Sequence, residues 1–243
     1  MRCPPAVGHQ THRCPRETPA VGAAPAACPL CRAVGPQPLL SIEGRDYWRC
    51  VSCALRFLEP RQHPPPEAEF ACYLQHENDP DDTGYRRFLS KLTTPLLARL
   101  APASSGLDYG CGPGPALPAM LRDAGHAVAL YDPFFHPDPE PLARTYDFVT
   151  CTEAVEHFHR PAEEFDRLMS LVQPGGWLAI MTCFQTDDAL FAGWHYRREP
   201  THVVFYREAT MRTLAAARGW SCEIPAKDVA LMRCSRQAAS IGT

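Results

Sequence analysis

The sequence predicts a mixed α/β fold, with a mostly parallel sheet, a terminal antiparallel strand and a small cysteine-rich module before it. From Gly106 onward, apolar runs of strand length alternate with helical patterns, which is typical of a parallel sheet covered by helices. The last two runs are separated only by Pro225-Ala226-Lys227, too short for a crossover helix, so they should form an antiparallel hairpin. Two Cys-x-x-Cys pairs precede this alternation.

Each element is expected where its pattern is clearest. We expect strands near 106–110, 127–131, 146–151, 176–183, 220–224 and 228–233, and helices near 85–100, 115–124, 161–172 and 207–218. The first helix contains Pro95 and should kink or restart there. The domain limits predicted on this basis are a disordered tail at 1–26, the cysteine module at 27–58, a linker at 59–84, the α/β domain at 85–235 and a tail at 236–243.

Bulk properties narrow the class of protein. The chain has 243 residues, 45% of them hydrophobic, and a formal net charge of -3, so nothing in its overall charge favours nucleic acid or membranes. No apolar run approaches a membrane span, and the first residues lack the apolar core of a secretory signal. We therefore expect a cytoplasmic protein without a membrane partner. In that reducing compartment, its 12 cysteines favour metal binding over disulfides.

The strongest local motif runs from Leu107 to Gly114. Glycines at 110, 112 and 114 let the backbone turn sharply between a strand and the start of a helix, close to a ligand. A dinucleotide fingerprint needs its third glycine at position 115, where this chain has proline. The lysine and hydroxyl residue that end a P-loop are absent as well.

Two carboxylates accompany the loop. Asp108 lies two residues before Gly110, and Asp132 follows the strand at 127–131, at the edge where open α/β sheets bind ligands. Asp132 could accept hydrogen bonds from both hydroxyls of a ribose. The alternative is that it caps the turn before Pro133.

These residues resemble class I methyltransferases that use S-adenosylmethionine, over about residues 105–235. Besides the loop and Asp132, the likeness rests on Tyr146–Cys151 and on Pro174-Gly175-Gly176 before the strand at 176–183. The resemblance implies a Rossmann-like sheet of seven strands, S-adenosylmethionine as cofactor, and cofactor contacts at Asp108, Gly110, Gly112, Gly114, Asp132 and Thr152.

One departure from the family pattern concerns the third strand. Only 14 residues separate Asp132 from Asp147, and four of them are prolines. We therefore expect the usual helix and third strand to be lost or shortened, which leaves the adenine contacts unassigned.

A run of acidic residues and histidine follows the strand at 146–151. If it is helical, Glu153, Glu156 and His157 share one face through i, i+3 and i+4 spacing and could hold a divalent cation such as Mg²⁺. The run resembles the metal motif of ubiquinone-pathway O-methyltransferases and of small-RNA ribose 2′-O-methyltransferases. In the latter a later histidine adds a ligand, which here corresponds to His202. The alternative is that these residues only line the pocket or cap the turn.

Further polar residues are candidates for the acceptor site. A general base, where the acceptor needs one, could be His157, His159, His195 or His202. The segment 194–198 is where the family places substrate-covering residues, and its Arg197 and Arg198 could meet an anionic group.

The cysteine module has the spacing of a tetrahedral metal site. Cys28 with Cys31, and Cys50 with Cys53, form two Cys-x-x-Cys pairs 18 residues apart. The module resembles a zinc ribbon, which implies a structural Zn²⁺ with all four positions filled.

Together these features predict an S-adenosylmethionine-dependent methyltransferase, most consistent with O-methylation of a small molecule; RNA is a weaker possibility. The alternative is a zinc-ribbon module that binds nucleic acid or protein on an inactive methyltransferase scaffold.

Overall fold

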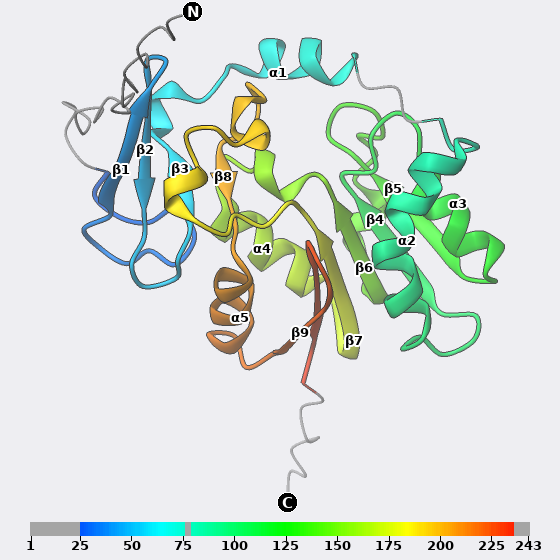
Figure 1. Ribbon diagram of the computed structural model, residues 1–243. Coiled ribbons are helices and arrows are strands. Elements are labelled where there is room, and N and C mark those ends of the chain that lie inside the picture. Colours follow the sequence, from blue (N-terminus) through cyan, green and yellow to red (C-terminus); the bar gives the residue numbers. More distant parts are fainter. Residues whose placement is uncertain (1–24, 76–78, 236–243) are drawn as a thin grey trace, which may run out of the picture.

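The computed structural model describes residues 25–75 and 79–235, and these form two sheets (Figure 1). The smaller sheet has the strand order β1-β2-β3-β8 and is antiparallel throughout. Its strands are β1 (Gln37–Ile42), β2 (Arg45–Arg49), β3 (Arg56–Leu58) and β8 (Val204–Phe205). The larger sheet has the order β5-β4-β6-β7-β10-β9. The expected tails fall almost entirely outside the described residues.

The larger sheet has a parallel part and an antiparallel end. Its parallel strands are β4 (Ser105–Tyr109), β5 (Ala127–Tyr131), β6 (Tyr146–Thr152) and β7 (Val172–Met181). Most residues of β4 and the second half of β7 are buried, as expected for strands covered on both faces. The hairpin of β9 (Ser221–Ala226) and β10 (Val229–Arg233) pairs antiparallel with β7 through β10. The predicted fold class is confirmed.

Helices cover both faces of this sheet. On one face, α2 (Thr83–Leu97) and α3 (Ala116–Asp123) pack leucines against Phe148, Trp177 and Leu231. On the other, α4 (Pro161–Ser170) and α5 (Glu208–Ala216) pack against Val149, Leu178 and Met232. Pro95 lies in the last turns of α2, so the helix continues past it for only two residues.

The third-strand unit is missing. Between β5 and β6 the described chain contains only a bridge between Asp132 and His136 and a short 3-10 turn, η2 (Glu140–Ala143). The larger sheet therefore has six strands where the family resemblance implied seven. The shortened connection was expected from its length and its prolines, which leave no room for a helix.

The cysteine module is packed against the α/β domain. Its residues Leu30, Tyr47 and Phe57 belong to the same buried cluster as Phe191 and Tyr206. The segment 59–84 contains η1 (Pro60–Gln62) and α1 (Pro66–Tyr73), which passes above the two parts in Figure 1. The predicted domain limits stay predictions, although hydrogen bonds between β3 and β8 cross the limit at residue 58.

Among the described residues, no helix is both long and apolar enough to cross a membrane.

Candidate functional site

The glycine loop has the sharp turns that its sequence predicts. Gly110 and Gly112 have φ angles of +75° and +65°, a region that favours glycine. The Gly110 N–H donates to the carbonyl of Tyr131, 2.8 Å away, which ties the loop to the end of β5. A Cβ on Gly110 would lie 2.7 Å from the Cβ of Ala154. The backbone of this loop therefore has no space for a side chain at position 110.

Asp132 ties the end of β5 to the glycine loop. One carboxylate oxygen accepts from the N–H of Gly112 at 3.0 Å, and the other accepts from the N–H groups of Phe134 and Phe135 at 2.9 and 3.0 Å. Asp132 thus caps the turn that contains Pro133, Phe134 and Phe135, so the alternative of a turn cap beside Pro133 is consistent with these bonds. It also lines a cavity, and a carboxylate has about four acceptor positions, so one is left for a ligand hydroxyl.

Asp108 lies beneath the loop. Its carboxylate is almost completely buried and accepts a hydrogen bond from Oγ1 of Thr150 on β6 at 2.6 Å. Burial raises the pKa of Asp108 to about 7, against the opposing effect of the Thr150 hydrogen bond. Asp108 therefore joins two strands under the loop.

We expect Asp108→Asn to gain stability over the wild type as the pH rises. Asp108 titrates near 3.8 when unfolded and near 7 when folded, so ionisation first favours the unfolded chain and wild-type stability falls across that window. Asparagine keeps an oxygen that can accept from Thr150. The stability difference should grow by up to about 4 kcal/mol between pH 4 and pH 7 and then level off. Urea unfolding at several pH values measures it, and a pH-independent difference would contradict this reading.

A cavity of about 980 Å³ opens at the carboxyl ends of the parallel strands. Of the six predicted cofactor residues, Gly110, Gly112, Asp132 and Thr152 line it, whereas Asp108 and Gly114 do not. Sequence reasoning missed much of the wall: Glu69, Tyr73, Tyr85, Phe134 and Phe135 also line the cavity. The first two belong to α1, in the segment interpreted as a linker, and no local signal marks them as pocket residues.

The run after β6 does not form the expected helix. Glu153 has a φ of +48°, and only a single 3-10 turn, η3 (Val155–His157), follows it. The structure nevertheless brings Glu156, His157 and His202 together, with one potential ligand atom from each within 4.8 Å of the others. Glu153 lies outside that group but lines the cavity. Three of the four predicted residues therefore meet, through a tertiary contact.

Tyr196 joins the two glutamates. Its hydroxyl donates to the carboxylate of Glu156, and one oxygen of Glu153 lies 3.4 Å from the same hydroxyl. Burial raises the pKa of both carboxyls, and the charge of Glu156 raises the pKa of Glu153 further. The other oxygen of Glu156 is buried and has no hydrogen-bond partner among the described residues, and the same holds for Oγ1 of Thr152. Buried polar atoms without partners in a cavity wall mark places where a ligand can bind.

The two histidines of the group are held by backbone carbonyls. Nδ1 of His157 lies 3.1 Å from the carbonyl oxygen of Thr201, and Nδ1 of His202 lies 2.7 Å from that of Tyr196. A carbonyl can only accept, so Nδ1 carries the proton and Nε2 carries the lone pair of each neutral ring. Backbone contacts of this kind orient metal-ligating histidines in proteins.

The two arginines of the segment 194–198 have different environments. Arg198 lines the cavity, as expected for a residue that meets an acceptor. Arg197 does not, and this expectation was wrong: its guanidinium is buried against the cysteine module and donates to Glu43 and to the carbonyl of Ala192. The candidate bases His159 and His195 also line the cavity, and His159 contacts Glu69 of α1 at 2.9 Å.

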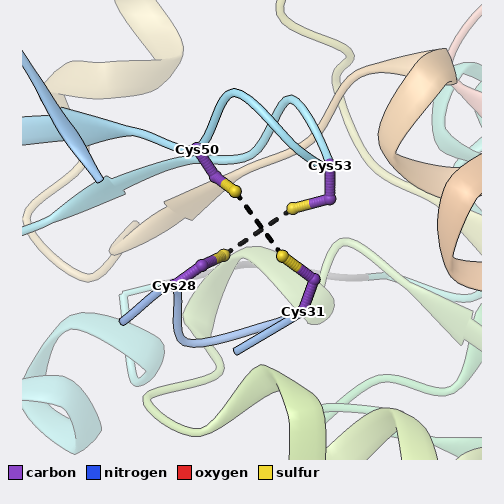
Figure 2. A group of neighbouring side chains, drawn as sticks. All are labelled: Cys28, Cys31, Cys50 and Cys53. Atoms are coloured by element: carbon purple, nitrogen blue, oxygen red, sulfur yellow. Dashed lines mark hydrogen bonds between the residues drawn. The ribbon is translucent and has the colours of Figure 1, made fainter. Parts of the chain in front are cut away.

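The four cysteines of the smaller module converge on one point (Figure 2). The Sγ atoms of Cys28 and Cys53 are 3.6 Å apart, and those of Cys31 and Cys50 are 3.5 Å apart. Tetrahedral zinc with Zn–S bonds of about 2.3 Å requires sulfurs about 3.8 Å apart. The donor set and its spacing therefore fit a structural zinc site.

Comparison with known proteins gives short or distant likenesses to individual methyltransferases. Over 38 residues the chain is 47% identical to the ubiquinone biosynthesis O-methyltransferase of Paraburkholderia xenovorans (strain LB400), and this match spans 16% of each protein. An O-methyltransferase family protein from Burkholderia thailandensis has 19% identity and a TM-score of 0.46, over 70% of this chain and 63% of that one. The 1,6-didemethyltoxoflavin-N1-methyltransferase of the same organism has 16% identity and a TM-score of 0.48, over 82% and 99%.

The family comparison is broader. A family model described as a methyltransferase domain matches residues 82–223, more than half of the chain. This range begins with α2 and includes the whole parallel sheet, the glycine loop and the cavity wall up to α5. The chain therefore belongs to the family of proteins that contain this methyltransferase domain.

Proposed function

We propose that this methyltransferase transfers the methyl group of S-adenosylmethionine to an oxygen atom of a small molecule. The observation that carries the proposal is the shared cavity, whose wall contains the glycine loop and also Glu156, His157 and His202. A volume of about 980 Å³ is at the upper end of the range for small-molecule sites. Such a cavity can hold donor and acceptor together, which is what methyl transfer requires.

The cofactor half of the site is assigned to the glycine loop and its neighbours. The backbone of Gly110 and Gly112 would approach the ligand, Asp132 would accept from a ribose hydroxyl, and Thr152 would donate its unpartnered hydroxyl. Asp108 and Gly114 would support the loop from outside the cavity. For the adenine we propose the rings of Phe134 and Phe135, which lie directly after Asp132 where the third-strand unit is missing.

The acceptor half is assigned to Glu156, His157 and His202, with Glu153 beside them. These side chains could orient an acceptor hydroxyl and remove its proton. They could also hold a divalent cation, which would lower the pKa of such a hydroxyl. Two imidazoles and one carboxylate favour Mn²⁺, Fe²⁺ or Zn²⁺ over the Mg²⁺ expected from the sequence, because Mg²⁺ prefers oxygen ligands.

Two observations favour a small acceptor and oxygen as the acceptor atom. The formal net charge of -3 supplies no general attraction for RNA. The short stretch shared with a ubiquinone biosynthesis O-methyltransferase supports oxygen.

The cysteine module is assigned a structural Zn²⁺ at Cys28, Cys31, Cys50 and Cys53. The alternative, a binding module on an inactive scaffold, predicts no turnover with any acceptor although the cavity is present.

With zinc already bound at the four cysteines, we expect the wild-type chain to bind one Mn²⁺ ion at Glu156, His157 and His202. His202→Asn should weaken this binding at least about tenfold, because one of three ligands is lost. His195→Asn is the matched control, since His195 lines the same cavity outside the ligand group. Isothermal titration measures both variants. Equal Mn²⁺ affinity in wild type and His202→Asn would rule out the metal site and leave the three residues as a metal-free pocket wall.

A methyl-transfer screen tests the function itself. Labelled S-adenosylmethionine is incubated with phenols, carboxylic acids, glycans and RNA, with and without Mn²⁺ and Mg²⁺. Transfer to the oxygen of a small molecule is the expected result. Transfer to nitrogen, carbon or RNA alone would overturn the acceptor assignment, and no transfer by a chain that binds the cofactor would favour the inactive scaffold.

A further inference from the structure

The cysteine module shares backbone hydrogen bonds with the cavity wall. In the smaller sheet, β3 pairs with β8, with Phe57 opposite Val204 (Figure 1). The N–H of Leu58 donates to the carbonyl of Val203 at 2.8 Å, and the N–H of Val203 donates to the carbonyl of Glu156 at 2.9 Å. Val203 directly follows His202. A continuous path therefore leads from the module to two residues of the proposed acceptor site.

A second connection runs through Arg56. Its Nη1–H donates to the carbonyl of Ala54, the residue after the zinc-site cysteine Cys53. Its Nε and Nη2 donate to the two carboxylate oxygens of Asp188, both at 2.8 Å, and the Arg56 side chain is almost fully buried. Burial alone would raise the pKa of Asp188, but Arg56, with smaller contributions from Arg207 and Arg49, outweighs it and holds that pKa below its ordinary value. The ion pair of Arg56 and Asp188 therefore joins the second Cys-x-x-Cys pair, Cys50 and Cys53, to the start of the segment 188–205.

Aromatic packing fixes the same segment to the module. The ring of Tyr47 on β2 lies 5.1 Å from that of Phe191 and 6.1 Å from that of Phe205, measured between centroids, and all three are buried. Arg197 adds its ion pair with Glu43, in the turn between β1 and β2. Tyr196 and His202, which line the cavity, lie between these anchors. The glycine loop, by contrast, is held by β4, β5 and β6.

We propose that the cysteine module is a positioning element of the methyl-acceptor site, with Arg56 and β3 holding the segment 188–205 so that Tyr196 and His202 stand in the cavity wall. The inference rests on the proposed function, because it assigns this wall to the acceptor. It predicts that loosening the module disorders the acceptor half of the site and leaves the cofactor half intact. Zinc binding at the four cysteines would then stabilise the acceptor site indirectly, through the contacts of the module with the segment 188–205.

The test compares Arg56→Met with Arg61→Met in the full chain. Arg61 is the matched control, because it lies close to β3 in the same part of the chain, but its side chain is 67% exposed and its ion pair is with Glu59, outside the segment 188–205. We expect Arg56→Met to speed hydrogen exchange over residues 201–206 at least about tenfold, since it leaves Asp188 without its main partner. Exchange over residues 106–114 and the affinity for S-adenosylhomocysteine should change less than about twofold. Asp188→Asn, which removes the pair from the less buried side, should give the same pattern.

Two outcomes would overturn the proposal. One is exchange over 201–206 no faster in Arg56→Met and Asp188→Asn than in Arg61→Met. The other is an equal increase over 106–114, which would indicate general destabilisation. If the wild type did not bind S-adenosylhomocysteine, the proposed function would fail, whereas the exchange data would still decide whether the module orders the segment 188–205.

Discussion

Gly110→Ala is expected to weaken binding of S-adenosylhomocysteine at least about 50-fold. The φ of +75° costs a residue with a Cβ about 1–2 kcal/mol, and the new methyl group would lie 2.7 Å from the Cβ of Ala154. The loop must move to relieve this contact. A displacement of about 1 Å in a binding loop can cost two orders of magnitude. Isothermal titration at one pH measures the affinity, and circular dichroism checks that the variant is folded.

The matched control for this variant is Gly219→Ala. Gly219 has nearly the same φ, +71°, but a Cβ there would meet nothing within 4 Å, and it lies after α5 and away from the cavity. It should lose stability by a similar backbone strain and keep its cofactor affinity within about twofold. Equal affinities for the two variants would contradict the assignment of the glycine loop to the cofactor.

The second large effect is expected from Cys50→Ser. The wild type should contain one zinc ion per chain, and this variant should contain almost none, because it lacks one of four thiolates. Structural zinc contributes directly to folding, so the variant should lose at least about 3 kcal/mol of stability, or roughly 6–12 °C in melting temperature. Metal analysis of purified protein and thermal unfolding measure the two effects.

Cys222→Ser provides the control for that experiment. It makes the same thiol-to-hydroxyl change on the edge strand β9, outside the four-cysteine group. Its zinc content should equal that of the wild type, and its melting temperature should fall by no more than about 2 °C. A wild type without zinc and with four freely reactive thiols would contradict the metal assignment.

The elements that depend on local pattern could be predicted from the sequence. The strand at 127–131 has the bounds expected, and the helices at 115–124 and 161–172 are within two residues of theirs. Apolar periodicity and the turn at Gly110 are local properties, so the sequence contains them directly. The strand expected at 176–183 begins earlier, because β7 runs from Val172 to Met181 and includes Gly175. The spacing of the cysteines is also visible in the sequence, because each Cys-x-x-Cys pair needs only a tight turn to bring its two thiols together.

The elements that depend on tertiary contacts could not be predicted in this way. The face shared by Glu153, Glu156 and His157 assumed a helix, but the chain must turn at the end of β6, and Glu153 adopts a left-handed conformation there. His202 joins Glu156 because the N–H of the next residue, Val203, donates to the carbonyl of Glu156, a contact between segments far apart in sequence. The contact of Arg197 with Glu43 also joins distant segments. Pairing between distant segments leaves no periodic signal in either one.

The most direct test of the whole account is equilibrium binding of S-adenosylhomocysteine to the wild-type chain, with S-adenosylmethionine as competitor. The cavity and its glycine loop predict one site per chain with a dissociation constant of about 1–100 μM, and displacement by S-adenosylmethionine. Absence of binding at about 1 mM ligand by a folded, zinc-containing chain would contradict the account, because the loop at Gly110 would then serve only as a turn.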